Sequence, residues 1–252
     1  RWLAFHLVYP WIDGFLVISE ALGDVARRHG SPKAIITQVP ILTDGADLPP
    51  RNVETEVAPY IFHAGTLTEE KDGISTVVEA FAKCAAERPQ LRFEFSNYTT
   101  LPSVKQRMEA IFATYQVRDR VTFHRHLSRE TLQEKLLGCA FVVVNKPDNL
   151  RNRHNFSTKL GEYMSLGLPI ITTATGDAAQ YLVDGENCLL ITDASDSDEI
   201  AHHMQTLLDD PMLARTLGEH ARQTSQTSFA YSRHASALGA FFQSVGDHAR
   251  LG

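Results

Sequence analysis

A loop that contains two glycines and a lysine follows an apolar segment of the sequence and could hold a phosphate. It runs from Gly65 to Gly73 and carries Lys71 two positions before the second glycine. Gly65 permits close approach of a ligand to the backbone, and a helix that begins at Gly73 would direct free N–H groups at an anion. An ordinary strand-to-helix turn explains the same residues, and this loop alone favours that interpretation. The chain carries neither a Walker loop nor the G-x-G-x-x-G fingerprint.

Positive charge is concentrated in a second loop, between residues 151 and 159. Its basic residues are Arg151, Arg153, His154 and Lys159, and it contains no acid although the chain has a net charge of −6. Such an excess would attract a diphosphate. A helix that begins near Phe156 or Ser157 would add the positive end of its dipole, and Glu162, on the face of Thr158, could accept hydrogen bonds from a sugar diol. A solvated basic loop with an ordinary surface glutamate is an equally good interpretation.

Both loops must be positioned by a β-sheet, and the hydrophobic pattern predicts one. The chain has 252 residues, of which 43% are hydrophobic and 21% are charged, an ordinary globular composition. Segments of helical periodicity alternate with short β-rich segments at residues 15–19, 34–39, 60–64, 91–95, 120–123, 141–145, 169–172 and 187–191. Several strands are apolar on both faces, as in a parallel sheet covered by helices. The alternation predicts an α/β fold with a doubly wound, Rossmann-like parallel sheet, in which ligands bind at the carboxyl ends of the strands.

Composition and motif spacing argue against several other classes of function. The 24 Lys and Arg residues against 30 Asp and Glu residues disfavour a nucleic-acid partner. The three cysteines form no C-x-x-C pair, which favours a reducing, cytosolic setting. No H-E-x-x-H motif indicates zinc, and the D-x-D triplet that starts at Asp196 precedes a predicted helix, where it is more typical of a helix cap than of a metal site. The apolar stretch at residues 2–18 is interrupted by polar residues and is too short for a spanning helix.

The second loop opens a longer segment that resembles the donor-binding segment of family 4 retaining glycosyltransferases. This segment reads FSTKLGEYMSLGLPIITT from Phe156, followed by TGD at 175–177 and VDGEN at 183–187. The stretch HAGTLTEEKDG from His63 resembles the first donor-domain loop of that family, and DGFLVISE from Asp13 resembles the end of its acceptor domain. In order and spacing, the resemblance covers nearly the whole chain.

The resemblance implies a two-domain GT-B fold in which the C-terminal domain binds a nucleotide sugar. It implies that Lys71 binds the diphosphate, that Glu162 binds the ribose, and that both are catalytic. The other implied donor-binding residues are Gly65, Thr66, His126, Leu127, Arg153, His154, Phe156, Ser157, Thr158 and Lys159. Gly65 would let the diphosphate approach, the backbone of residues 156–158 would contact phosphate or sugar, and residues 126–127 would lie against the base.

Two positions depart from the usual pattern of that family. Thr66 stands where the family usually has an arginine, and His154 stands where it usually has a glutamate. Arg151, Arg153 or Lys159 could supply the charge that Thr66 lacks, and the sequence does not choose among them. The histidine changes how the hydroxyls of the donor sugar are held.

The chain is predicted to contain four segments. They are the tail of an N-terminal acceptor domain at residues 1–40, a linker at 41–58, the donor domain at 59–228, and a C-terminal helix at 229–252 that returns toward the N-terminal domain. Because the sequence opens at Arg1 without methionine, we expect a fragment whose N-terminal domain is missing. The apolar residues expected to pack on that domain are Trp2, Phe5, Trp11 and Phe15.

We therefore expect a retaining, metal-independent hexosyltransferase that moves a sugar from a UDP- or GDP-sugar to a glycan or lipid-linked acceptor, in bacterial polysaccharide biosynthesis. No cofactor besides the donor and no covalent nucleophile are expected, because positioning and electrostatics would stabilise the leaving diphosphate. The isolated chain would be poorly active without the missing domain. A cytoplasmic location is expected, and peripheral association of the full-length enzyme with the inner face of the membrane is compatible with it. A nucleotide-sugar epimerase of GT-B architecture and a non-catalytic nucleotide-binding fragment are the alternatives.

Overall fold

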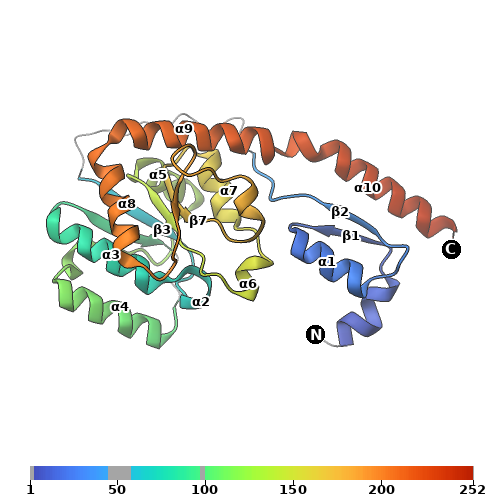
Figure 1. Ribbon diagram of the computed structural model, residues 1–252, viewed down its shortest axis with the longest axis horizontal. Coiled ribbons are helices and arrows are strands. Elements are labelled where there is room, and N and C mark those ends of the chain that lie inside the picture. The colour runs from blue at the N-terminus through green and yellow to red at the C-terminus, as the bar shows by residue number, and fades with distance from the viewer. Residues whose placement is uncertain (1–2, 45–57, 97–99, 252) are drawn as a thin grey trace.

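The chain folds into a larger and a smaller unit that are bridged by a long C-terminal helix (Figure 1). The computed structural model describes residues 3–44, 58–96 and 100–251, so Trp2 and most of the linker predicted at 41–58 lie outside the described residues. In the smaller unit, β1 (Gly14–Val17) pairs in parallel with β2 (Ile35–Gln38), and α1 (Glu20–His29) connects the two strands. Short helices at Ala4–Val8 and Tyr9–Trp11 precede this unit.

The larger unit contains the predicted doubly wound parallel sheet. One half consists of β3 (Tyr60–Ala64), β4 (Arg92–Ser96) and β5 (Val121–Phe123), and the other of β6 (Val142–Val144), β7 (Ile170–Thr173) and β8 (Leu189–Ile191). A parallel bridge between Ile61 and Phe141 joins β3 to the segment that enters β6. The spatial order is therefore β5-β4-β3-β6-β7-β8, which confirms the predicted fold class. The order reverses between β3 and β6, the switch point at which open α/β sheets bind ligands.

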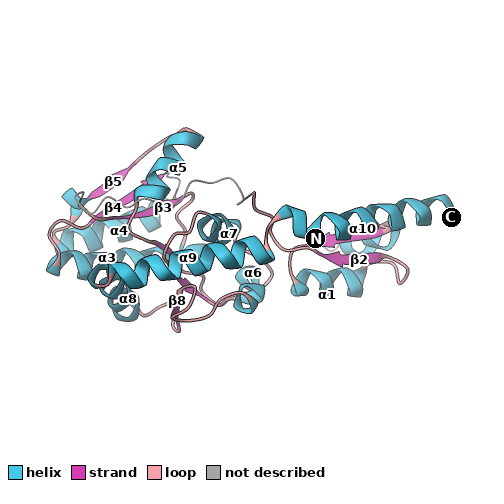
Figure 2. Ribbon diagram, turned by 90° about the horizontal axis from the view of Figure 1, so that it is seen from above, coloured by secondary structure: helices cyan, strands magenta, loops and turns pink. Residues whose placement is uncertain are grey.

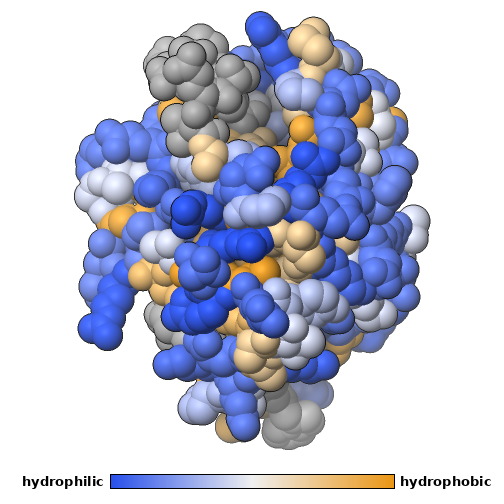
Figure 3. All heavy atoms as spheres, turned by 90° about the vertical axis from the view of Figure 1, so that its left-hand side faces the viewer, coloured by the Kyte–Doolittle hydropathy of each residue, from blue (hydrophilic) through white to orange (hydrophobic). Residues whose placement is uncertain are grey.

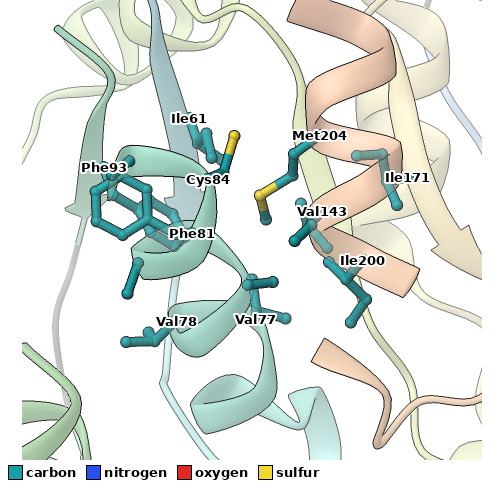
Figure 4. Close-up of a cluster of buried hydrophobic side chains, with 14 of the residues drawn as sticks. Ile61, Val77, Val78, Phe81, Cys84, Phe93, Val143, Ile171, Ile200 and Met204 are labelled. Atoms are coloured by element: carbon teal, nitrogen blue, oxygen red, sulfur yellow. The ribbon is translucent and has the colours of Figure 1, made fainter. Parts of the chain in front are cut away.

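Helices cover both faces of this sheet because its strands are apolar on both faces. The principal helices of the unit are α3 (Ile74–Glu87), α4 (Pro102–Tyr115), α5 (Arg129–Gly138), α7 (Thr158–Ser165), α8 (Ser197–Asp209) and α9 (Pro211–Ser228). Val143 belongs to the core shared with α3, α4 and α8, whereas Val142 and Val144 belong to the core shared with α5 and α7. In the first core, Cys84 of α3 faces Met204 of α8, and the ring of Phe81 packs beside Phe93 (Figure 4).

The long helix α10 (Tyr231–Leu251) runs from the end of α9 over the smaller unit (Figures 1 and 2). The contact is tight, since a Cβ placed on Gly14 would stand 2.5 Å from Val245 and 2.8 Å from Phe241. The two connections between the units lie side by side, because Thr43 donates its N–H to the Phe229 carbonyl oxygen at 2.8 Å. The division into acceptor tail, donor domain and returning helix stays a prediction.

The surface is mostly hydrophilic on the end of the molecule shown in Figure 3. Around the N-terminus, by contrast, Trp11 is 83% exposed and Leu7 is 60% exposed. Phe5 is half-buried and stacks on His29 with ring centroids 4.5 Å apart. Packing of this stretch on a further domain stays a prediction. Within the described part of the chain, no helix is long and apolar enough to cross a membrane.

Candidate functional site

The loop after β3 begins with a left-handed glycine and continues into two helices. Gly65 has φ +101°, and Thr66 is exposed. A four-residue helix, α2 (Glu69–Asp72), carries Lys71, and Gly73 with φ +50° separates it from α3. The predicted helix from Gly73 therefore starts one residue later. The free N–H groups expected there are partly used, because the Glu69 carboxylate accepts the Ser75 N–H at 3.3 Å.

Asn152 connects the loop after β6 to α2. Its side chain belongs to the short helix α6 (Leu150–Arg153) and is buried, with Nδ2 lying 2.8 Å from the Pro147 carbonyl oxygen and 3.3 Å from the carbonyl oxygens of Glu70 and Lys71. The two ligand-binding loops predicted from the sequence are therefore held together at the switch point of the sheet.

A buried ion pair lies beneath these loops. Lys146 Nζ is 2.6 Å from Asp72 Oδ1, and their side chains are 9% and 4% exposed. Burial lowers the pKa of Lys146, and the carboxylate of Asp72 opposes that shift. Sequence reasoning missed both residues; the signal available was a lysine placed two positions after the buried run Val142–Val144. Asp72 forms its ion pair with Lys146, and its charge also acts on Lys159 without forming an ion pair with it.

Lys159, in the first turn of α7, is a buried ammonium group without a partner. Among the described residues, its Nζ has no hydrogen-bond acceptor. The side chain lies over the loop after β3, since a Cβ placed on Gly65 would stand 3.2 Å from Lys159 Nζ. Burial lowers the pKa of Lys159 to about 8; the charges of Lys146 and Lys71 add to this shift, and those of Asp72 and Glu162 oppose it. No side chain within the described residues caps the N-terminus of α7 at Ser157, so helix dipole and ammonium group have the same sign there.

His63 at the end of β3 is a second buried group without a partner. Its side chain is 6% exposed, and no described residue accepts or donates a hydrogen bond at Nε2. Burial, followed by the charges of Lys159, Lys146 and Lys71, holds its pKa well below the usual value. The imidazole is therefore neutral at pH 7, and it adds no charge to the three lysines.

The two arginines of the basic loop are engaged by acids outside it. Arg153 contacts Asp148 through Nε–Oδ1 at 2.5 Å and through its second nitrogen to Oδ2 at 2.7 Å. Arg151 lies 4.0 Å from Glu70. All four side chains are more than half exposed. The predicted excess of positive charge is thus smaller than the interval 151–159 indicates, and Lys159 is its buried component.

The other predicted site residues lie in three different settings. Glu162 and Thr158 are exposed on α7, one turn apart. Phe156 is 1% exposed, and its ring packs against Phe229 with centroids 5.5 Å apart, so only its backbone can face a ligand. His126 and Leu127 lie on the loop between β5 and α5, two strands away from the switch point.

An open groove of about 680 Å³ lies beside these residues, at the carboxyl ends of β6, β7 and β8. Glu69, Lys146, Asp148, Thr175 and Asp193 are among the residues that line it. Lys159 and Glu162 do not line this groove. Lys146 lines the groove, and its charge also acts on Lys159, so the groove and the unpartnered lysine are neighbouring features.

Two other groups singled out in the sequence have structural partners. The Asp196 carboxylate accepts hydrogen bonds from the N–H groups of Asp198 at 2.8 Å and Glu199 at 3.1 Å, which confirms the predicted helix cap. His124 Nε2 lies 2.8 Å from Glu94 Oε2. No group of three or more His, Cys, Asp or Glu residues in the described parts of the chain could hold a metal ion.

The geometry agrees with a family match that spans most of the chain. Residues 46–224 match the family described as Glycosyl transferases group 1, and the chain belongs to that family. An alpha-D-kanosaminyltransferase of Streptomyces kanamyceticus is 20% identical over 257 residues, covering 98% of this chain and 64% of that protein. The lipopolysaccharide core biosynthesis mannosyltransferase LpcC of Rhizobium leguminosarum bv. viciae is 32% identical over 84 residues, covering 33% of this chain and 24% of that protein.

Solved structures share the fold. Sucrose-phosphate synthase from Thermosynechococcus elongatus superposes with a TM-score of 0.73 at 23% identity, covering 95% of this chain and 60% of that one. Anabaena HepE in complex with UDP superposes with a TM-score of 0.72 at 16% identity, covering 92% of this chain and 64% of that one. The expected GT-B type of fold is confirmed. The chain spans less than two thirds of the length of these relatives.

Proposed function

We propose that the chain contains the donor-binding half of a retaining glycosyltransferase that moves a hexose from a UDP- or GDP-sugar to a glycan or lipid-linked acceptor. The observation that carries the proposal is Lys159, whose ammonium group is buried against Gly65 without a partner. A buried charge without a counter-ion is unfavourable, so a site that retains one is suited to an anionic ligand. A diphosphate at the switch point would supply the missing negative charge.

The residues around Lys159 suggest how such a donor would be held. Lys71 and Lys159 would both contact the diphosphate, and the N-terminus of α7 would add its dipole. Lys159 would thereby supply the charge that the family usually places at the position of Thr66. Glu162, exposed one turn into α7, would accept hydrogen bonds from the ribose hydroxyls. These groups bind and orient the donor and stabilise its leaving group, with no covalent step on the protein.

The printed names of the relatives support a sugar-transfer reaction. Two curated relatives are named as a kanosaminyltransferase and a mannosyltransferase, and the HepE structure contains UDP. Retention of configuration and the class of acceptor are both proposed on the resemblance of the donor segment to family 4 retaining glycosyltransferases. A nucleotide-sugar epimerase is the second candidate, because its donor site would need the same cations.

Calorimetry on the 252-residue chain tests the proposal. UDP, GDP, ADP and CDP and their glucose or mannose conjugates would be titrated into the parent, into Lys159→Met and into Lys33→Met, a control at an exposed lysine in the turn before β2. We expect UDP or GDP to bind the parent and the control equally, and Lys159→Met to bind ten- to a hundredfold more weakly. Equal binding by all three proteins, or no binding to the parent, would contradict the donor site. Turnover of a UDP-sugar to an isomer without any acceptor would favour the epimerase.

A further inference from the structure

A group of polar contacts joins the smaller unit to the loops of the proposed donor site. Asp177 lies in the 3₁₀ helix η4 (Gly176–Gln180) and is 8% exposed. Its Oδ2 accepts hydrogen bonds from the backbone N–H of Glu20 at 2.8 Å and from the side-chain amide of Gln38 at 2.7 Å. The Ser19 hydroxyl donates a hydrogen bond to the His154 carbonyl oxygen at 3.0 Å. The three pairs are 157, 139 and 135 positions apart, so they are products of the tertiary structure.

These contacts use the N-terminus of α1, a ten-residue helix. Ser19 is fully buried and is the N-cap, where its oxygen accepts the Leu22 N–H at 3.3 Å while its hydroxyl proton is directed at His154. The Asp177 carboxylate satisfies the N–H of Glu20 and lies at the positive end of the helix dipole. Hydrogen bonds and the helix dipole therefore hold the Ser19 hydroxyl and the Asp177 carboxylate at the N-terminus of α1.

Helices α1 and η4 also hold residues 150–157, the second part of the connection between β6 and α7, which we call the donor loop. A Cβ placed on Gly176 would stand 2.9 Å from the Arg153 carbonyl oxygen, so the backbone of η4 lies directly against α6. The side chain of His154 is held as well, because its Nδ1 lies 2.8 Å from the Leu150 carbonyl oxygen. Contacts run from α1 through Asp177 and η4 to the donor loop, and return to α1 through Ser19.

We propose that Asp177 and Ser19 are positioning residues that anchor the donor loop to α1 and keep it ordered for the donor. A loop that is ordered before binding loses less conformational freedom when the ligand arrives, so anchoring raises affinity without direct contact. The effect on donor affinity rests on the proposed function, whereas the anchoring does not require a nucleotide. The two parts can therefore be measured separately.

Hydrogen–deuterium exchange and calorimetry on Asp177→Ala test the proposal. Asp196→Ala is the matched control, since it also removes a carboxylate that accepts two hydrogen bonds, but at the start of α8. We expect Asp177→Ala to increase exchange about tenfold in peptides 20–29 and 149–157 and to weaken UDP binding about three- to tenfold. The control should speed exchange at the start of α8 and leave UDP affinity unchanged. Asp177→Asn retains an acceptor oxygen and should behave almost like the parent.

Each result decides one part of the proposal. Unchanged exchange at 149–157 in Asp177→Ala overturns the anchoring. Faster exchange with unchanged UDP affinity overturns the link between anchoring and donor binding, while the proposed function stands. A parent chain that binds no nucleotide contradicts the proposed function, while hydrogen–deuterium exchange still tests the anchoring. If Asp177→Ala does not fold, Gln38→Ala removes one of the two hydrogen bonds from an exposed side chain and should give a smaller increase in the same peptides.

Discussion

Replacing Lys159 by methionine should stabilise the chain and weaken its binding of nucleotide diphosphate. The Nζ atom of Lys159 is buried without a hydrogen-bond or ion-pair partner among the described residues, and its pKa falls from 10.5 to about 8. A fall of that size corresponds to about 3 kcal/mol of unfavourable free energy for the charged form in the folded chain. Because the residue is half-buried, solvent screening reduces the expected gain for Lys159→Met to about 1 to 3 kcal/mol.

The stability that Lys159→Met gains over the parent should decrease as the pH rises. Below pH 8 Lys159 is charged in the folded and the unfolded chain, so the folded state carries the full cost of the buried charge. Between pH 8 and 10.5 the folded chain loses this proton and the unfolded chain keeps it, so the stability of the parent rises with pH. The advantage of Lys159→Met is therefore largest at pH 7 and decreases above pH 8.

Thermal unfolding followed by circular dichroism at pH 7 and pH 9.5 measures this difference. At about 2 to 4 °C per kcal/mol for a chain of this size, Lys159→Met should melt several degrees above the parent at pH 7 and closer to it at pH 9.5. Calorimetry on the same samples should show the ten- to hundredfold loss of UDP affinity. Lys33→Met should change neither quantity. A variant that melts below the parent and still binds UDP normally would refute the assignment of Lys159 as an anion-binding group.

One titration of the parent and four substitutions test the site and the core beneath it. In isothermal titration near pH 8.5, binding of UDP to the parent should be accompanied by uptake of up to one proton, because the phosphate restores the charge of Lys159. The uptake is measured as a dependence of the binding heat on the ionisation enthalpy of the buffer. A binding heat that is the same in all buffers would contradict direct contact between Lys159 and the phosphate. Lys71→Ala should weaken UDP binding about ten- to a hundredfold and uridine binding little, whereas Glu162→Gln should weaken the binding of both. If calorimetry instead shows that Glu162→Gln affects only UDP and Lys71→Ala affects both ligands, their proposed roles are exchanged. Gly65→Ala should weaken UDP binding, because the new Cβ would stand 3.2 Å from Lys159 Nζ and the backbone has φ +101°. Normal UDP affinity would show that Lys159 can move without a loss of binding. Phe156→Ala should lower stability by about 3 to 5 kcal/mol in urea unfolding, and a cost below 1 kcal/mol would contradict its place in the core.

The sequence by itself determined the strands, the class of fold and the two loops of the site. Runs such as Val142–Val144 are apolar at every position, and a strand buried on both faces requires that pattern. The polar ends of β3 and β6 could be located as loops because the carboxyl ends of parallel strands share one edge. The pattern beginning at Phe156 was sufficient to indicate the family, since its residues are contiguous. Local signals of this kind need no knowledge of which segments meet.

Only the tertiary structure decided which charges remain available for a ligand. Lys146 and Asp72 are 74 positions apart, and their pairing depends on the adjacent positions of β3 and β6, which the Ile61–Phe141 bridge joins. Arg153 is engaged by Asp148, whereas Lys159 is buried without a partner against Gly65. The strength of a charge interaction is set by distance in space and by the removal of water, and neither quantity is encoded in sequence spacing. For this reason the sequence left three cations as equal candidates, and the folded chain distinguishes Lys159 from the other two.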